Sequence, residues 1–177
     1  PFLDRSFFWS RGRWWIALGE DKVEIIEVVE KGDRENPLFE ITLEREENME
    51  GVSSMLGFDE DPILFYQLGE KDPIMSKIIE EFYGARIPRS RSLFEAAVTT
   101  VLEQQISMKV ASVLRKRLVE TWGRGPFSRE GEEIFAFPVP WDIAKTSPEE
   151  LKKIGMSSAK ARTIYRLAEM IEEKEID

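Results

Sequence analysis

Residues Phe94–Ser107 have the sequence FEAAVTTVLEQQIS, the clearest helix signal in the 177-residue chain. Ser92 precedes the segment as a helix N-cap, and Glu95 follows three residues later, which is the spacing of a capping box. Apolar residues recur every four positions, in one row from Leu93 and in another from Phe94. The pattern predicts a helix over 94–106, with Gln104–Ser107 forming the turn to the next helix.

The sequence that follows predicts a second helix over Met108–Trp122. Its inward face is expected to consist of aliphatic residues, namely Val110, Val113, Leu114 and Leu118. The basic run Arg115–Arg117 is expected to point mostly outward. The polar segment Gly123–Glu133 is interpreted as a loop.

Proline and serine mark the remaining elements of this half. Phe135–Trp141 is an aromatic connector that its two prolines hold extended. Ser147 starts a second capping box, which predicts a short helix that Gly155 ends. Ser157 is expected to cap a last helix that runs to about Glu173.

The first half of the chain predicts strands instead. Three β-branched or aromatic segments alternate with turn residues such as Gly19-Glu20-Asp21 and Gly32-Asp33. These segments are Ser6–Leu18, which folds back around a Ser-Arg-Gly-Arg turn, Val23–Val29 and Leu38–Leu43. We expect an antiparallel sheet with one solvated face.

Two short helices follow the sheet, and each starts with an Asp-Pro pair. Asp61-Pro62 and Asp72-Pro73 place proline at the first helical position behind an aspartate cap. The predicted helices run to about Leu68 and Tyr83. Gly84 and Pro88 then interrupt the chain, and no strand signal is found after them. The predicted fold class is therefore α+β, with a sheet domain over 1–83 and an all-helical part over 84–177.

Composition excludes several kinds of chemistry. The chain has no Cys and no His, which rules out disulfides, thiolate catalysis and histidine-based triads. No run approaches the roughly 18 apolar residues of a membrane span, so we expect no membrane partner. The absence of Cys fits a reducing compartment, and we expect a cytoplasmic, nucleoid-associated prokaryotic protein.

The net charge of −9 is unevenly distributed along the sequence. Residues 1–83 carry nine basic and 20 acidic residues, a net charge of −11. Residues 84–170 carry 15 basic and 10 acidic residues, a net charge of +5. Such asymmetry favours a nucleic-acid surface in the second half only, although an excess of this size is also ordinary for a solvated helical surface.

The helical half resembles the helix-hairpin-helix DNA glycosylases, and most of all the bacterial and archaeal 3-methyladenine (alkylbase) glycosylases. Three motifs carry the resemblance in the family's order and spacing over about Tyr83–Glu173. They are the helix that ends in Gln104-Gln105-Ile106-Ser107, the connector Phe137-Pro138-Val139-Pro140 and the helix–turn–helix from Leu151 to Ala161. The resemblance also implies that the first half is the TATA-binding-protein-like sheet domain of that family.

The sequence departs from the family at its end. In the family, a Gly-x-Gly hairpin and a catalytic Asp follow the helix that ends here near Glu173. Neither Asp142 nor Asp177 matches the catalytic position. We therefore expect the chain to be the non-catalytic front part of a glycosylase, an incomplete domain over 84–177 whose partner is the C-terminal segment of the same protein.

The resemblance assigns DNA-binding roles to the turn between the first two helices. Gln105 matches the residue that fills the gap left by a flipped nucleotide, with Gln104, Ile106 and Ser107 beside it and Lys109 close behind. The alternative is that the two glutamines only hydrogen-bond a helix end.

The second predicted contact surrounds Ser157 and Ser158. Hydroxyls and free amides at a helix N-terminus suit a phosphate, and Lys160 adds positive charge one turn later. The alternative is an ordinary serine cap with a solvated lysine. No base pocket, metal site or catalytic residue is assigned.

Aromatic residues crowd the first strands. Any of them can stack on a flipped base, but core packing is the more common role of such residues. The residues are Phe7, Phe8, Trp9, Trp14 and Trp15.

The predicted function is removal of alkylated purines from damaged duplex DNA in base-excision repair, by base flipping and N-glycosidic hydrolysis without a cofactor. An oxidised-guanine glycosylase is the alternative within the superfamily. A non-catalytic nucleic-acid- or protein-binding module, or a structural fragment without a function of its own, are the alternatives outside it.

Overall fold

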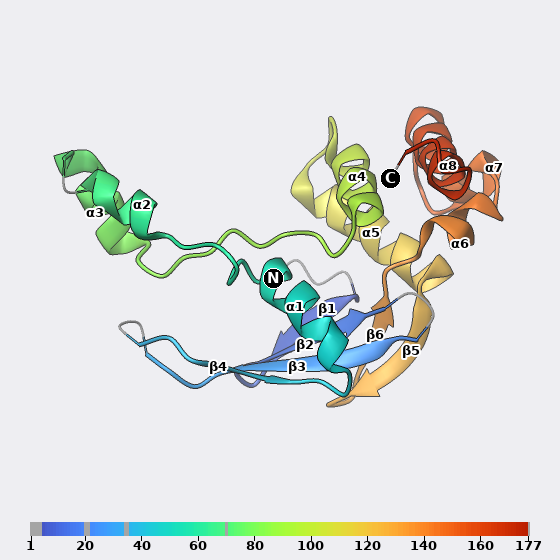
Figure 1. The fold of residues 1–177 in the computed structure, drawn as a ribbon. Coiled ribbons are helices and arrows are strands. Elements are labelled where there is room, and N and C mark those ends of the chain that lie inside the picture. The colour runs from blue at the N-terminus through green and yellow to red at the C-terminus, as the bar shows by residue number, and fades with distance from the viewer. Residues whose placement is uncertain (1–4, 20–21, 34–35, 70, 177) are drawn as a thin grey trace.

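The computed structural model describes residues 5–19, 22–33, 36–69 and 71–176 (Figure 1). Its described elements form a sheet with one helix against it, a helix pair that projects to one side and a second group of helices at the other end. Among them, no helix is long and apolar enough to cross a membrane. Residues 20–21 of one predicted turn, and Asp177, lie outside the described ranges.

The N-terminal strands form a four-stranded antiparallel sheet, as predicted. The strands are β1 (Phe7–Ser10), β2 (Arg13–Leu18), β3 (Glu24–Glu30) and β4 (Phe39–Thr42), and they are hydrogen-bonded in that order. The β1–β2 turn uses Arg11 and Gly12, both with positive φ, as tight hairpins require. The α+β fold class is therefore confirmed.

One face of this sheet is covered by a helix that was not predicted from the sequence. The short 3-10 turn η1 (Glu46–Asn48) leads into α1 (Met49–Met55), which buries Val52 against Ile16, Ile26 and Val28 of the sheet. Asn48, at the N-cap, makes no side-chain hydrogen bond to the helix. Because α1 is only seven residues long, its sequence did not mark it as a helix.

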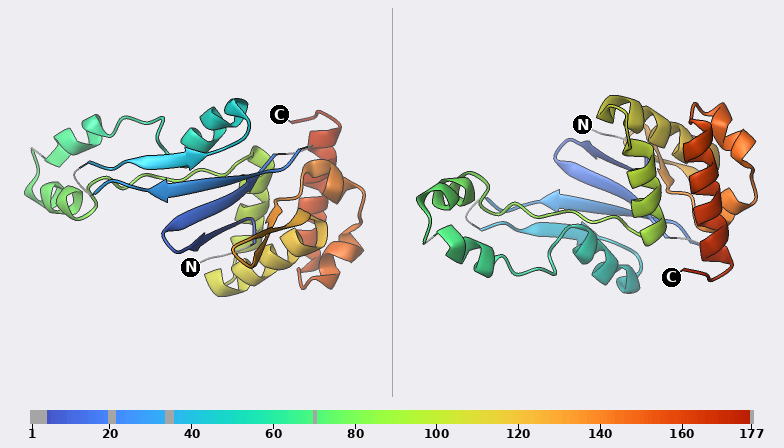
Figure 2. Two further views of the ribbon diagram at one scale, coloured as in Figure 1. Left: turned by 90° about the horizontal axis from the view of Figure 1, so that it is seen from below. Right: turned by 90° about the horizontal axis from the view of Figure 1, so that it is seen from above.

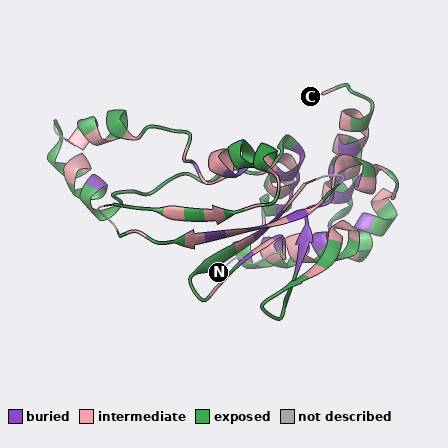
Figure 3. Cartoon of the chain, turned by 60° about the horizontal axis from the view of Figure 1, so that its bottom comes forward, coloured by how far each residue is buried: buried purple, intermediate pink, exposed green. Residues whose placement is uncertain are grey.

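The two Asp-Pro helices are confirmed as α2 (Ile63–Gly69) and α3 (Pro73–Glu81). The Asp72 carboxylate accepts hydrogen bonds from the Ile74 and Met75 amides, at 2.8 and 3.3 Å. The pair projects away from the sheet (Figure 2), and most of its surface is exposed or only half-buried (Figure 3). Tyr66 of α2 stacks on Tyr83 beyond α3.

The second half contains five described helices around the largest core of the molecule. They are α4 (Leu93–Glu103), α5 (Met108–Trp122), α6 (Pro140–Ala144), α7 (Pro148–Lys153) and α8 (Ser158–Glu172). Their core includes Leu102, Leu118, Ile143, Leu151 and Ile164, all fully buried. The predicted caps Ser92, Ser147 and Ser157 each accept the backbone N–H three residues later.

The prediction of an all-helical second half was wrong. The predicted polar loop over 123–133 instead forms most of a hairpin, whose strands are β5 (Arg124–Arg129) and β6 (Glu132–Ala136). Ile134 and Ala136 of β6 share a buried cluster with Phe8 of β1 and Ala17 of β2. The Phe135 amide also donates to the Arg5 carbonyl at 2.7 Å. The hairpin thus joins the two halves through a common core, while the boundary at 83/84 stays a prediction.

The helix faces also differ in part from those expected. Val110 and Val113 are exposed, and Ala111 and Val119 are buried in their place. The helix α4 ends at Glu103 rather than at Ile106. The predicted connector over 135–141 is shorter in the structure. Phe135 still belongs to β6, and Pro140 is already the first residue of α6.

Candidate nucleic-acid interface

The turn between α4 and α5 leaves the helix through an unusual backbone conformation. Gln104 adopts extended ψ (130°), and Gln105 has φ of +56°, the left-handed region that side chains other than glycine seldom occupy. Ser107 then caps α5, its hydroxyl accepting the Val110 amide at 3.4 Å. Ile106 packs on the helical core, while Gln104, Gln105 and Ser107 are exposed. The half-buried isoleucine therefore anchors a turn whose polar side chains face outward.

The turn before α8 is held by a side chain of α5. Gly155 has φ of +105°, so a residue with a side chain would be strained there, and its Cβ would lie 3.1 Å from Arg117 Nη1. Arg117 donates to the Ile154 carbonyl at 3.0 Å. Met156 is buried, whereas Ser157 and Ser158 are exposed at the start of the helix. The serine hydroxyls and the first amides of α8 therefore face the surface.

Lys160 brings the two turns together. Its Nζ donates to the Leu102 carbonyl at 2.5 Å, and its own amide donates to Ser157 Oγ at 3.3 Å. Since Leu102 lies near the end of α4 and Lys160 near the start of α8, the two helices run antiparallel and side by side (Figure 2). Both turns therefore lie at the same end of the helical part, as does exposed Lys109 in the first turn of α5.

All eight residues predicted to bind DNA thus lie at one end of α4, α5 and α8. Four of them have structural roles as well. Ile106 packs against the core, Ser107 caps α5, Ser157 caps α8, and the Lys160 ammonium holds the end of α4 rather than extending freely into solvent. Whether the set binds DNA stays a prediction.

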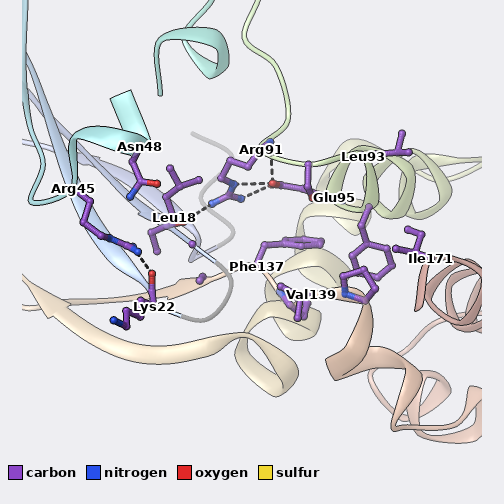
Figure 4. A pocket seen from close by; sticks show the side chains of 17 residues that line it. Leu18, Lys22, Arg45, Asn48, Arg91, Leu93, Glu95, Phe137, Val139 and Ile171 are labelled. Carbon is purple, nitrogen blue, oxygen red and sulfur yellow. Dashed lines mark hydrogen bonds and ion pairs between the residues drawn. The ribbon is translucent and has the colours of Figure 1, made fainter. Parts of the chain in front are cut away.

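A buried ion cluster lies at the other end of α4, where the helical part meets the sheet (Figure 4). The Glu95 carboxylate accepts hydrogen bonds from the guanidinium groups of Arg91 and Arg115. Arg91 also donates to the Ala17 carbonyl at 3.1 Å and to Ser6 Oγ at 2.7 Å, both in the sheet region. One carboxylate therefore connects the sheet, α4 and α5.

The second arginine links this cluster to the connector before α6. The Arg115 guanidinium donates to Thr99 Oγ1 and lies 4.8 Å from the ring centre of Phe137, a cation–π contact. The expectation that Arg115 points outward was therefore wrong, because its side chain is only 14% exposed.

Electrostatics keep Glu95 ionised despite its burial. Burial by itself would raise its pKa, but the hydrogen bonds and positive charge of Arg91, together with those of Arg115, outweigh that effect and lower the pKa. The carboxylate thus balances part of the charge of two largely buried guanidinium groups.

Two hollows flank this cluster. One, of about 670 Å³, is the pocket of Figure 4, bounded by Leu18, Arg91 and Phe137. The other, of about 530 Å³, extends from Phe7 and Trp14 of the sheet to Glu103 and Met108, the residues that flank the Gln104–Ser107 turn.

The aromatic residues of the first strands divide between core and surface. Phe8 is buried and stacks on half-buried Trp15, while Phe7 packs on the cluster under α1. Trp9 and Trp14 are exposed, so core packing accounts for three of the five. Elsewhere in the described ranges, no group of acidic side chains gathers in a way that could hold a metal ion.

Comparisons with known proteins agree with this architecture. Residues 98–176 match the model of the HhH-GPD superfamily of base excision DNA repair proteins. The DNA-3-methyladenine glycosylase of Bacillus subtilis (strain 168) is 31% identical over 132 residues, which are 75% of this chain and 43% of that protein. The chain belongs to the HhH-GPD superfamily.

Two solved structures extend the likeness to the sheet. The 3-methyladenine DNA-glycosylase from Archaeoglobus fulgidus superposes with a TM-score of 0.77 at 25% identity, over 95% of this chain and 59% of that one. The Clostridium acetobutylicum 8-oxoguanine glycosylase/lyase, in complex with double-stranded DNA, superposes with a TM-score of 0.74 at 16% identity, over 100% of this chain and 61% of that one. At this identity the likeness shows the shared fold alone. The chain thus spans about two fifths to three fifths of the lengths of these proteins.

The matched HhH-GPD range contains both turns. It starts inside α4 at residue 98, ends beyond α8 and includes all eight predicted site residues, whereas the sheet and α1–α3 lie outside it. The ion cluster spans this limit, since Arg91 and Glu95 precede the range and Arg115 lies within it.

The ion cluster was not predicted from the sequence, because Glu95 also fits the third position of a capping box. A signal was present, since Glu95 lies three and seven residues before Val98 and Leu102, on the buried face of α4. A charged side chain that is buried on an apolar face is usually paired, so Glu95 indicated a nearby cation. The sequence did not indicate which arginines supply it.

Proposed function

We propose that the full-length protein is a DNA-repair glycosylase that removes alkylated purines from damaged duplex DNA. The observation that carries this proposal is the placement of the turns at 104–107 and 156–160 at one end of the helical part, joined through Lys160 and Leu102. Both turns lie within the range that matches a base excision repair family. Relatives named DNA-3-methyladenine glycosylases support alkylated purines as the substrate class.

Gln105 is proposed to occupy the space that a flipped nucleotide leaves in the duplex. Extrusion of a base costs a few kcal/mol in lost stacking and pairing, and a side chain that fills the gap offsets part of this cost. Gln105 is exposed at the tip of a turn between two packed helices, and its amide both donates and accepts hydrogen bonds. Such a group suits the orphaned base on the opposite strand.

The phosphate backbone is proposed to lie across the start of α8 and the first turn of α5. Ser157 and Ser158 present hydroxyls beside the free amides of α8, a 15-residue helix whose N-terminus favours anions. Lys109 adds an exposed positive charge on α5. Contacts of this type fix the register of the protein on DNA without reading the base.

The proposed reaction needs little catalytic assistance, because an alkylated purine is a good leaving group. Alkylation at purine N3 gives the base a positive charge, so it departs with little assistance beyond a carboxylate and an aromatic surface that attracts cations. No catalytic residue is assigned in this chain, and base release is proposed as a property of the full-length protein.

Incubation of the full-length protein with duplexes that contain either 3-methyladenine or 8-oxoguanine tests the proposal. Chromatography of the freed bases should show release of the alkylated purine and little of the oxidised one. Release of 8-oxoguanine alone would assign the protein to the oxidised-guanine branch. Binding that weakens steeply with salt but releases neither base would instead support a non-catalytic binding module.

The Gln105→Ala variant tests the proposed role of the turn. Single-turnover release of 3-methyladenine should fall by roughly tenfold to several hundredfold, since the side chain acts only once the base has left the stack. Binding to undamaged duplex should change little. A variant that releases base at the wild-type rate would show that Gln105 only completes a helix end.

A further inference from the structure

The Lys160 ammonium contacts the protein backbone rather than extending into solvent, where a phosphate would bind. The side chain is half-buried, and its ammonium donates to the Leu102 carbonyl at 2.5 Å. Leu102 is fully buried, and its carbonyl is among the last four of α4, which have no partner within their own helix. Lys160 therefore satisfies a backbone acceptor that lies just before the turn.

Charge also favours this contact. A positive group in the first turn of a helix opposes the macrodipole of that helix, whereas the same group at a helix C-terminus is favourable. Lys160 belongs to the first turn of α8 but places its ammonium at the end of α4. Its position is thus electrostatically suited to α4 and not to its own helix.

The backbone beyond the contact is strained. Gln105, three residues after Leu102, has φ of +56°, which costs on the order of 1 kcal/mol or more for a residue with a side chain. Such a conformation persists only where its surroundings hold it. On one side Ile106 packs on the core, and on the other Lys160 fixes the end of α4.

We propose that Lys160 is a positioning residue for Gln105, which holds the end of α4 so that the left-handed turn presents the Gln105 side chain to the duplex. The inference rests on the proposed function for the role of Gln105 in DNA. It differs from the role predicted from the sequence, in which the Lys160 charge binds a phosphate. One N–H of the ammonium is engaged by Leu102, and the contact joins both turns into one unit.

The first experiment measures amide hydrogen exchange in the wild-type chain and in Lys160→Met, without DNA. The variant should exchange roughly tenfold faster at residues 101–103 of α4, with the middle of α5 unchanged, since a charge-assisted hydrogen bond is lost. Lys160→Arg, which keeps a donor, should restore most of the protection. Unchanged exchange in Lys160→Met would overturn the proposal, whatever the protein does to DNA.

The second experiment uses the full-length protein and separates positioning from phosphate binding. Lys160→Met should slow single-turnover release of 3-methyladenine roughly tenfold, while its affinity for undamaged duplex and its salt dependence stay unchanged. Lys109→Met is the matched control. It should weaken binding to damaged and undamaged DNA alike and lower the salt dependence by about one ion.

A double-mutant cycle completes the test. If Lys160 acts through Gln105, Lys160→Met should have almost no further effect on base release in the Gln105→Ala background. Additive effects, or a salt dependence reduced by about one ion in Lys160→Met, would overturn the proposal in favour of a phosphate ligand. Should the wild-type protein release no base, the function proposed above fails, and the exchange experiment still decides the role of Lys160.

Discussion

Helices in the pair α2–α3 and in the group α4–α8 begin with the same kind of N-cap, but their apolar side chains are buried to different extents. Asp72 caps α3 in the same way that Ser157 caps α8. Yet Leu64 of α2 is 75% exposed, whereas Leu118 of α5 is fully buried. Caps and periodicity therefore determine where a helix begins and ends, while the stability of the helix depends on the surface against which its apolar face packs.

Charged groups show the same contrast. In the helical part, Glu95 is buried between Arg91 and Arg115. In the segments that flank α2–α3, Arg89 pairs with Asp59 at 2.6 Å and also with Glu60, but these side chains are 41% exposed or more. Both clusters lower the pKa of a carboxylate. Removal of one partner is expected to be costly only in the buried cluster, because water screens the charge that is left behind in the exposed one.

The largest effect is expected from Glu95→Gln. The substitution leaves two largely buried guanidinium groups without their carboxylate, and removal of one partner of a buried ion pair typically costs about 3–5 kcal/mol in the free energy of unfolding. The matched substitution Asp59→Asn, beside exposed Arg89, should have no measurable effect. Urea unfolding of both variants checks the difference. Equal losses would mean that the exposed cluster is as well shielded as the buried one.

Acid titration sharpens this prediction. Because the pKa of Glu95 is lowered in the folded state, its contribution to stability is fully present above the ordinary value of 4.5 and is lost as the pH falls through the lowered pKa. The stability difference between the wild type and Glu95→Gln should therefore shrink below about pH 4.5. A difference that stays constant down to pH 3 would contradict an ionised Glu95.

The same contrast shows which parts of the structure the sequence predicts. Local signals were sufficient for α3, with Asp72-Pro73 at its start, and for α8, with Ser157. The β5–β6 hairpin was missed because the sequence of β5, RGPFSR, lacks alternation. Its partner strand β6 buries Ile134 against residues more than 100 positions earlier. Contacts between segments so distant in sequence leave no local pattern.

The candidate site shows the same division. Sequence and resemblance identified the turn at 104–107 and the start of α8. They did not show that Lys160 reaches Leu102, 58 residues earlier, or that Glu95 pairs with Arg115, 20 residues later. Both contacts depend on how the helices pack, and no residue spacing in the sequence reports that.

A matched pair of leucines is expected to give the second largest effect. Leu118→Ala removes a fully buried side chain from the helical core and should cost about 2–5 kcal/mol in the free energy of unfolding. Leu64→Ala makes the same chemical change on exposed α2 and should cost about 0.5 kcal/mol or less. Urea denaturation of the two variants measures both. A loss at Leu64 as large as that at Leu118 would show that α2 is covered in solution.

The smallest effect is expected where α3 and α4 end. After α3 the chain turns through Gly84 with φ of +82°, and after α4 it turns through Gln105 with φ of +56°. Glycine adopts this conformation without steric cost, whereas a residue with a Cβ does not. Gln105→Gly should therefore raise the free energy of unfolding, by up to about 1 kcal/mol once the greater freedom of the unfolded chain is subtracted. Gly84→Ala, in open space, should lower it by a similar amount.

Thermal and urea unfolding of these two variants, with base release by the full-length Gln105→Gly protein, completes the comparison. Glycine at 105 removes the strain and also the amide that is proposed to enter the duplex, so stability should rise while base release falls. Opposite changes of this kind are expected where a strained residue is retained for function. If Gln105→Gly instead destabilises the chain by more than about 1 kcal/mol, the loss exceeds the entropic cost of glycine in the unfolded chain, and the glutamine side chain makes a stabilising contact of its own. Gln105 would then be a structural helix-end residue.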